Sequence, residues 1–150
     1  MEKSDANAQI LRKARAKFIP ERASDLGVEG YDDQVADLEP QVYERWIAAL
    51  GTAQDELKTR FEKTTDAAVK QDLEIMLGNI QRTMDTDKLE HEMLLPYLSV
   101  ERHAFNGIRV LLDPRISTER QAFAVARLRR YAALEPGSMP MTAVSCARAE

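Results

Sequence analysis

The sequence has only one cysteine, two histidines and no long run of apolar residues. A single thiol, Cys146, excludes an intramolecular disulfide framework. No window approaches the roughly 18 uninterrupted apolar residues that a membrane-spanning helix requires. The N-terminal stretch mixes acids and bases, where a secretory signal has a basic start followed by an apolar segment. We therefore predict no membrane span and, for the chain as written, a cytoplasmic location.

Neither sign of charge dominates the chain, which has 25 acidic and 21 basic side chains and a net charge of −4. Such a chain has no global attraction to a phosphate backbone, so we predict no nucleic acid among its partners. The hydrophobic share of 44% and the charged share of 31% are typical of globular proteins. With 150 residues, the chain has a one-domain length. We expect a helical region over residues 1–137 and an irregular tail over 138–150.

The common metal and nucleophile motifs are missing as well. A zincin helix needs a second histidine four positions after the first, and Leu95 stands there after His91. A di-iron bundle needs a glutamate three positions before each histidine, and Lys88 and Val100 stand there instead. The glycines form neither a phosphate loop nor a nucleophile elbow. We predict no catalytic, metal or cofactor-binding residues, and interpret His91 and His103 as surface or hydrogen-bonded side chains.

What the sequence does contain is apolar periodicity at helical spacing. Residues 5–18 form a first helical stretch, and two long amphipathic stretches follow Pro40 and the Thr65-Asp66 pair. Because their connection is short, the two should lie antiparallel with their apolar faces together. The predicted fold is an all-α helical bundle with a long hairpin, about 40–63 and 66–88, and shorter flanking helices. The predicted core positions are Val42, Trp46, Leu50, Ala53, Leu57, Phe61, Val69, Leu73, Met76, Leu77, Ile80 and Met84.

Glycine and proline positions modify this pattern. Gly51 and Gly78 lie inside the hairpin helices at a cost near 1 kcal/mol each relative to alanine, which indicates close helix contact or a local break. Pro96 and the Asn106-Gly107 pair interrupt the later periodicity. We predict two short helices there, joined near residues 96–99.

The last helix is predicted over residues 120–134, preceded by a capping box formed by Thr118 and Gln121. It carries a basic cluster that could hold an acidic partner or an RNA strand. In an acidic protein, such a cluster is more typical of a helix face paired with nearby carboxylates, which is our interpretation. Its members are Arg127, Arg129, Arg130 and Tyr131.

Three stretches resemble one protein family in the same order. "PERASDLGVEGYDDQVADLEP" has a proline, a short turn, Leu-Gly, a Tyr-Asp-Asp loop and a Leu-x-Pro helix start. "LLPYLSVERHAFNGIRVLLDPR" and "RLRRYAALEPG" follow, and all three lie within residues 18–137. Together they resemble the bacterial domain-of-unknown-function 885 family. Its members are far longer, largely helical, often exported or lipid-anchored, and regarded as zinc-dependent peptidases or hydrolases.

The metal motif of that family is a His-Glu segment followed by Gly-His-His in the C-terminal half, and nothing in this chain resembles it. The resemblance implies zinc only for that missing half, and no catalytic residue carries over. It implies that this chain is an N-terminal helical scaffold region of a metallopeptidase- or hydrolase-like protein, inactive by itself. The alternative is an autonomous helical module for protein–protein interaction.

The Tyr-Asp-Asp loop supplies the candidate site residues, which are Gly27, Gly30, Tyr31, Asp32 and Asp33. The two glycines permit positive φ at turns. The aspartates, with Asp37, are predicted to accept hydrogen bonds from nearby backbone N–H groups and to cap the helix at Pro40. In the longer relatives such a loop would border the substrate cleft. The alternative is a rigid connector that fixes the angle between two helices.

Uncovered apolar surface is a further expectation for a region of a larger helical protein. The predicted partners are therefore a second copy, through self-association, or the missing C-terminal half. The apolar side chains that two short helices cannot bury alone are Leu94, Leu95, Tyr97, Leu98, Phe105, Leu111 and Leu112.

Overall fold

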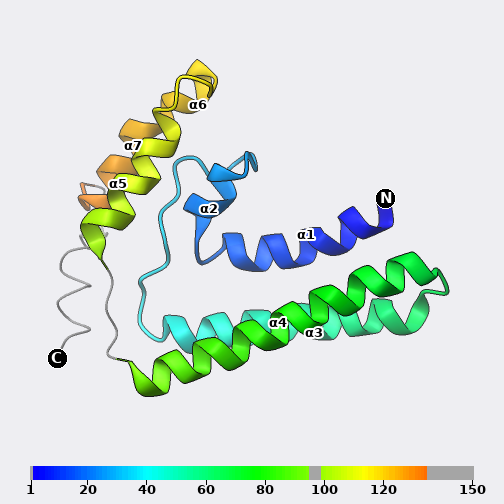
Figure 1. Ribbon diagram of the computed structural model, residues 1–150. Coiled ribbons are helices and arrows are strands. Elements are labelled where there is room, and N and C mark those ends of the chain that lie inside the picture. Colours follow the sequence, from blue (N-terminus) through cyan, green and yellow to red (C-terminus); the bar gives the residue numbers. More distant parts are fainter. Residues whose placement is uncertain (1, 95–98, 135–150) are drawn as a thin grey trace. The chain divides into compact units, whose positions relative to one another are not determined.

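The computed structural model describes residues 2–94 and 99–134, and these ranges form helices and connections without a strand (Figure 1). This confirms the predicted all-α fold. The predicted tail, residues 138–150, lies outside the described residues. The helices are α1 (Glu2–Ala16), α2 (Pro20–Asp25), α3 (Val42–Lys63), α4 (Ala67–Met93), α5 (Val100–Leu111), α6 (Thr118–Gln121) and α7 (Phe123–Tyr131).

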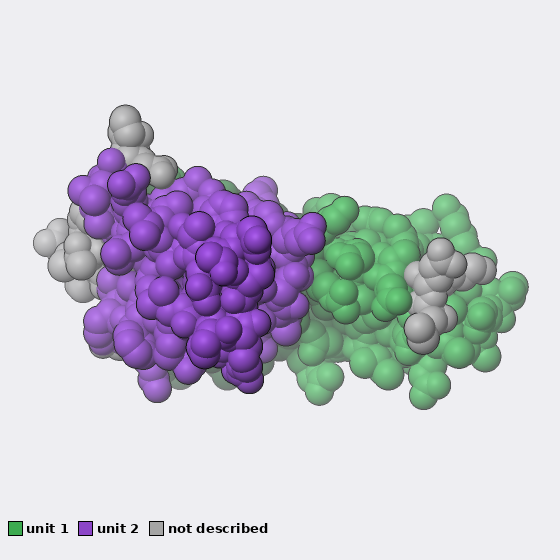
Figure 2. Space-filling model, turned by 90° about the horizontal axis from the view of Figure 1, so that it is seen from above, with its two compact units in different colours: residues 1–15, 39–94 green, residues 16–38, 95–150 purple. Residues whose placement is uncertain are grey.

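The chain divides into two compact units, which Figure 2 colours separately. Unit 1 comprises residues 1–15 and 39–94, and unit 2 comprises residues 16–38 and 95–150. Unit 1 contains the long helical hairpin, whereas unit 2 contains the Tyr-Asp-Asp loop. The chain length alone indicated one domain; its contacts form two clusters, each made of segments distant in the sequence.

The hairpin of unit 1 is built from α3 and α4, which lie side by side in antiparallel directions (Figure 1). Its buried core has the predicted apolar periodicity: Leu50, Ala53, Leu57, Val69, Leu73 and Ile80. Trp46, Phe61, Met76, Leu77 and Met84 pack against this core while partly exposed. Helix α1 adds apolar contacts from Ile10, Leu11 and Ala14. The predicted pairing of the two apolar faces is therefore confirmed.

Polar contacts also join α1 to the hairpin. Arg60 Nη1 donates to Asn7 Oδ1 at 2.9 Å, and Arg15 Nη2 donates to Asn79 Oδ1 at 2.6 Å. At the start of α4, Asp66 is the N-cap, one of the two residues predicted for this position, and its carboxylate accepts hydrogen bonds from the N–H groups of Ala68 and Val69. Such a cap satisfies donors that have no partner inside the helix.

The predicted start of α3 is wrong. Pro40 lies before the helix, and Gln41 is the N-cap with a positive φ of 57° and no side-chain cap hydrogen bond. The loop aspartates therefore do not cap this helix. Helix α4 also continues to Met93, beyond the predicted end at 88. In this additional part of the helix, the ring of His91 stacks on Tyr43, with the ring centroids 3.9 Å apart.

Neither predicted consequence of Gly51 and Gly78 occurs. Both helices continue through these positions, and a Cβ at either glycine would meet nothing within 4 Å. These glycines lie on open surface.

Unit 2 is organised around α5, which contacts both α2 and α7. The predicted interruption at Asn106-Gly107 is wrong, because α5 runs through both residues. Gly107 is buried, and a Cβ there would collide with the Tyr131 hydroxyl and lie 3.2 Å from Cγ of Glu21. The glycine thus permits close approach of α5 to α7 rather than a break. The predicted junction near 96–99 lies largely outside the described residues.

The C-terminal helical segment is also divided differently from the prediction. Ser117, rather than Thr118, is the N-cap of the short α6, and α7 begins only at Phe123. Gln121 uses its amide to donate to the carbonyl oxygens of Asp113 and Ile116, instead of completing a capping box. Helix α7 ends at Tyr131, and Ala133 takes a positive φ of 52°.

Candidate functional site

The Tyr-Asp-Asp loop follows α2 and contains two turns that depend on glycine. Gly27 and Gly30 have φ values of 75° and 84°, which side chains rarely tolerate, and this confirms the predicted positive φ. Backbone hydrogen bonds hold the chain between and after these turns. Val28 N donates to Ala23 O at 2.9 Å, and Asp37 N donates to Phe18 O at 3.1 Å. The loop therefore holds Tyr31, Asp32 and Asp33 in set positions.

Asp32 is the most buried of the loop carboxylates, with an exposed fraction of 5%. Its Oδ1 accepts hydrogen bonds from Ser24 Oγ at 2.6 Å and from Arg120 Nη2 at 2.8 Å, while its Oδ2 accepts from Arg120 Nε at 2.7 Å. Arg120 also donates to the Ser24 carbonyl oxygen at 2.7 Å. This bidentate arrangement joins α6 to the loop and to the end of α2.

Asp33 and Tyr31 contact the basic cluster of α7. Arg130 forms an ion pair with Asp33, with Nη2 and Oδ2 2.8 Å apart, as the interpretation of a helix face paired with carboxylates predicts. Arg127 is different, because it is fully buried and donates to two backbone carbonyl oxygens. Its Nη1 lies 2.8 Å from Gly107 O and its Nη2 lies 2.7 Å from Tyr31 O. Arg129 is exposed.

Next to these pairs, Glu21 of α2 forms the centre of a second cluster. Its Oε1 accepts hydrogen bonds from the Tyr131 hydroxyl at 2.8 Å and from Ala36 N at 2.8 Å, and lies 3.0 Å from His103 Nε2. Glu21 and Tyr131 are both buried. Three helices and the loop thus meet at one carboxylate oxygen.

The pKa values of these groups follow from their partners. The hydrogen bonds from Arg120 lower the pKa of Asp32, and they prevail over burial, which raises it. Burial raises the pKa of Glu21, but hydrogen bonds from His103 and from backbone N–H groups bring it below its usual value. Burial, followed by the adjacent Glu21 charge, raises the pKa of Tyr131 far above its usual value. At neutral pH the two carboxylates are therefore ionised and the phenol is protonated.

This arrangement is suited to holding helices together rather than to proton transfer. A general base needs a pKa near the working pH and an oxygen that substrate can reach. Glu21 and Asp32 have lowered pKa values, and their bonded oxygens already accept from protein donors. The cluster also balances its charge, since three carboxylates (Glu21, Asp32 and Asp33) accompany three guanidinium groups (Arg120, Arg127 and Arg130).

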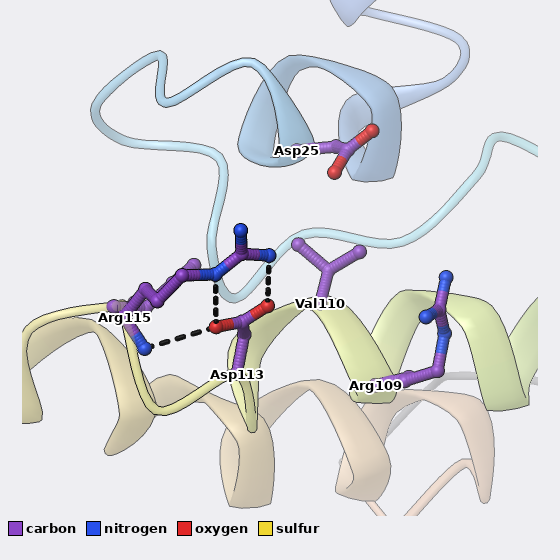
Figure 3. Close-up of a pocket in the computed structure, with 6 residues that line it drawn as sticks. Asp25, Arg109, Val110, Asp113 and Arg115 are labelled. Atoms are coloured by element: carbon purple, nitrogen blue, oxygen red, sulfur yellow. Dashed lines mark hydrogen bonds and ion pairs between the residues drawn. The ribbon is translucent and has the colours of Figure 1, made fainter.

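Unit 2 also has two hollows, and neither is lined by a member of this network. One, of about 400 Å³, is shown in Figure 3 and is lined by Asp25, Arg109, Val110, Asp113, Arg115 and Ile116. Within it, Arg115 folds over Asp113, with Nη2 and Oδ2 2.7 Å apart (Figure 3). Hydrogen bonds from Arg115 hold the pKa of Asp113 well below its usual range. The other hollow, of about 350 Å³, is more apolar and is lined by Phe105, Ile108, Arg109, Leu112, Asp113 and Pro114.

Sequence reasoning found the loop but missed most of its partners. His103 is hydrogen-bonded and His91 is exposed, as predicted. Glu21, Arg120 and the burial of Arg127 were not predicted, because each has a contact with a residue 82 to 110 positions away, such as Tyr131 for Glu21. The signal that could have found them is the large number of charged side chains in the two stretches that contain these residues. A charged side chain that becomes buried needs a partner.

Within residues 2–94 and 99–134, no group of three or more histidine, cysteine, aspartate or glutamate side chains is placed to hold a metal ion. In the same ranges, no helix combines the length and the apolar character needed to cross a bilayer.

Comparison with protein-family models, with curated proteins and with solved structures found no match to this chain.

Proposed function

We propose that this chain is the N-terminal helical scaffold region of a metallopeptidase- or hydrolase-like protein, of the type that its three stretches resemble. The observation that carries the proposal is the position of Arg127. This buried side chain lies in the third stretch and donates to Tyr31 O in the first and to Gly107 O in the second. The stretches that suggest the family are thus the stretches that pack together.

A scaffold role also agrees with the way the loop carboxylates are used. Asp32 and Asp33 accept from Arg120 and Arg130, which lie 28–34% exposed, so both carboxylates hold helices in place. A metal-binding or substrate-binding loop would instead present carboxylates toward an open cavity. The loop is therefore proposed as a rigid connector of the scaffold.

The first test concerns the coding DNA that adjoins this chain. If the chain is a scaffold region, an adjoining segment should encode His-Glu followed by Gly-His-His. When the two parts are expressed together, zinc-dependent peptide hydrolysis should require both. Adjoining DNA without such a segment would contradict the proposal and favour the autonomous interaction module. The observation that favours this second candidate is the exposed apolar surface at α5, where Phe105 on the helix and Leu112 directly after it are 65% and 61% exposed.

The second test uses the purified chain alone. We expect no stoichiometric zinc or iron after dialysis and no peptide hydrolysis, because the loop carboxylates are engaged by arginines. Elemental analysis is the measurement, with Asp33→Asn as the matched variant. About one metal ion per chain that disappears in Asp33→Asn would identify the loop as a ligand site and contradict its role as a connector.

A further inference from the structure

We propose that the hollow between the end of α2 and the C-terminal part of α5 binds a free α-amino acid with an aliphatic side chain. This α2–α5 hollow has a volume of about 400 Å³, and all the residues that line it belong to unit 2 (Figure 3). The volume is at the small end of the range for ligand pockets, so a small molecule is the suitable occupant. The inference goes beyond the scaffold role and does not depend on it.

Two of the four charged side chains that line this hollow neutralise each other. Arg115 donates from Nε to Asp113 Oδ1 at 2.9 Å and from Nη2 to Asp113 Oδ2 at 2.7 Å. The backbone N–H of Arg115 donates to the same carboxylate at 2.9 Å. This pair is complete in itself, so neither member needs a charge from a ligand.

The other two charged side chains, Asp25 and Arg109, have opposite signs. In the described part of the chain, neither forms a hydrogen bond or an ion pair, and no ion pair joins one to the other. Asp25 is the last residue of α2, whereas Arg109 lies on α5, and the two stand on opposite sides of the hollow (Figure 3). The hollow therefore offers a ligand one negative and one positive charge.

The two sides of the hollow are held in place by contacts of the protein itself. Ser24, directly before Asp25, is fully buried and donates from Oγ to Asp32 Oδ1 at 2.6 Å. Oε1 of Glu21 on α2 lies 3.0 Å from Nε2 of His103 on α5. A site whose walls are fixed in advance avoids the cost of ordering them when a ligand binds.

This charge pattern is the complement of an α-amino acid at neutral pH. A guanidinium group donates two parallel hydrogen bonds to a carboxylate, which assigns the ligand carboxylate to Arg109. The ammonium group of the same ligand then pairs with Asp25, so that no charge in the hollow lacks a partner. A phosphate monoester is less suitable, because its charge of about −1.5 to −2 exceeds that of one guanidinium group.

The remaining lining of the hollow favours an aliphatic side chain on the ligand. Val110 lies between Arg109 and Asp113 (Figure 3), and Ile116 adds a second aliphatic group. Contact with these side chains removes apolar surface of the ligand from water. Leucine is therefore the probe for this site.

The exposure of the two charged side chains limits the affinity. Asp25 and Arg109 are both exposed, and water screens ion pairs at such positions. We expect leucine to bind the whole chain with a Kd of about 1 mM. The measurement is a titration followed by two-dimensional NMR through the backbone amide signals of Val110 and Ile116. No change in these signals up to about 20 mM leucine would overturn the proposal.

Two analogues of leucine test the assignment of each charge. N-acetyl-leucine lacks the ammonium group and leucine amide lacks the carboxylate, so each should bind about three- to tenfold more weakly than leucine. Asp25→Asn should weaken leucine by a similar factor without weakening N-acetyl-leucine. Arg109→Gln should weaken leucine without weakening leucine amide. A variant that weakens leucine and both analogues equally would contradict the assignment, because its effect would not depend on the ligand group that it is proposed to contact.

Matched controls separate this hollow from general attraction. Arg102→Gln removes an exposed arginine of α5, and Glu29→Gln removes an exposed carboxylate of the loop; neither residue lines the hollow. Leu112→Ala alters the other, more apolar hollow, where Leu112 is 61% exposed although Leu111, predicted to be uncovered, is fully buried. None of the three should change the Kd of leucine.

These controls also define the results that would contradict the site. Weakening by Arg102→Gln or Glu29→Gln equal to that by Arg109→Gln or Asp25→Asn would indicate attraction by surface charge in general. Weakening by Leu112→Ala alone would place the ligand in the apolar hollow. Far-UV circular dichroism of each variant confirms that its helical content is kept.

Discussion

At the scale of single residues, unit 2 contains a buried ion pair and an exposed one, both between aspartate and arginine with bidentate geometry. Asp32 is 5% exposed and accepts from Arg120, whereas Arg115 beside Asp113 is 88% exposed. Water screens the exposed pair, but the buried carboxylate would lose its main source of stabilisation if its partner were removed. The same chemistry should therefore have unequal effects on stability.

We expect Arg120→Met to lower the free energy of unfolding by about 2–4 kcal/mol. The value is near the lower end for a broken buried pair, because Arg120 itself is partly exposed. Urea denaturation followed by circular dichroism is the measurement. The control is Arg115→Met, which should leave the unfolding midpoint unchanged. Equal effects of the two variants would mean that Asp32 is hydrated in the folded protein.

At the scale of the helical element, glycines with the same helical conformation have opposite roles. Gly78 lies in α4 with open space around it, whereas Gly107 lies in α5 where the helix approaches Tyr131. Alanine is the better helix former at both positions. Whether that preference appears in the stability depends on what a Cβ would meet.

We expect Gly78→Ala to raise the free energy of unfolding by about 0.5–1 kcal/mol and Gly107→Ala to lower it by about 1–3 kcal/mol. The cost arises because the added methyl group would collide with the Tyr131 hydroxyl. Thermal and urea denaturation of both variants test this.

Removing that hydroxyl should recover part of the loss. In the background of Tyr131→Phe, Gly107→Ala should lower the free energy of unfolding less than it does alone. The hydrogen bond from the Tyr131 hydroxyl to Glu21 is absent from both proteins in that comparison, so it does not affect the difference. Additive effects of the two substitutions would show that α5 and α7 do not meet in the way described.

At the scale of the whole molecule, the two units differ in the charged side chains that they bury, since Glu21, Asp32 and Arg127 all belong to unit 2. Unit 1 has an apolar core formed by α3 and α4, with contributions from α1. Unit 2 also buries apolar side chains such as Phe18 and Leu111, and in addition it buries carboxylates of lowered pKa at Glu21 and Asp32. The two units should therefore respond differently to acid.

We expect unit 2 to unfold before unit 1 as the pH falls. The usual pKa values are 4.5 for Glu21 and 3.8 for Asp32, and both are lowered in the folded chain. The unfolded chain then binds more protons, so this stabilisation is complete above about pH 5.5 and is lost progressively as the pH falls from about 4.5 through the lowered pKa values of the folded chain. The single tryptophan, Trp46, lies in unit 1 and reports on that unit.

The measurement compares circular dichroism with the fluorescence of Trp46 between pH 7 and about pH 2. Part of the helical signal should disappear at a higher pH than the change in fluorescence. Asp32→Asn should weaken the first transition, because it removes one of the titrating groups. A single transition seen by both probes, or stability that rises as the pH falls, would contradict this prediction.

The helices and the core of unit 1 were predictable from the sequence alone. Their signals are local, because apolar residues every three or four positions specify a helix and the face that it buries. The stripe that contains Leu50 and Leu57, and the cap at Asp66, illustrate this. The positive φ values of Gly27 and Gly30 were likewise predictable, since the reason for them lies in the glycine itself.

Only the tertiary structure decided what the polar residues of unit 2 do. Arg127 appeared to belong to an ordinary basic helix face, and Gly107 appeared to be a helix breaker. In the structure, Arg127 is a buried donor to a carbonyl oxygen 96 positions away, and Gly107 makes room for the Tyr131 hydroxyl. Local spacing cannot specify such partners, because hydrogen bonds and steric contacts depend on which distant segments the fold brings together. The sequence by itself therefore determined the helices of unit 1 and their apolar faces, and the packing of distant segments determined the ionic network of unit 2.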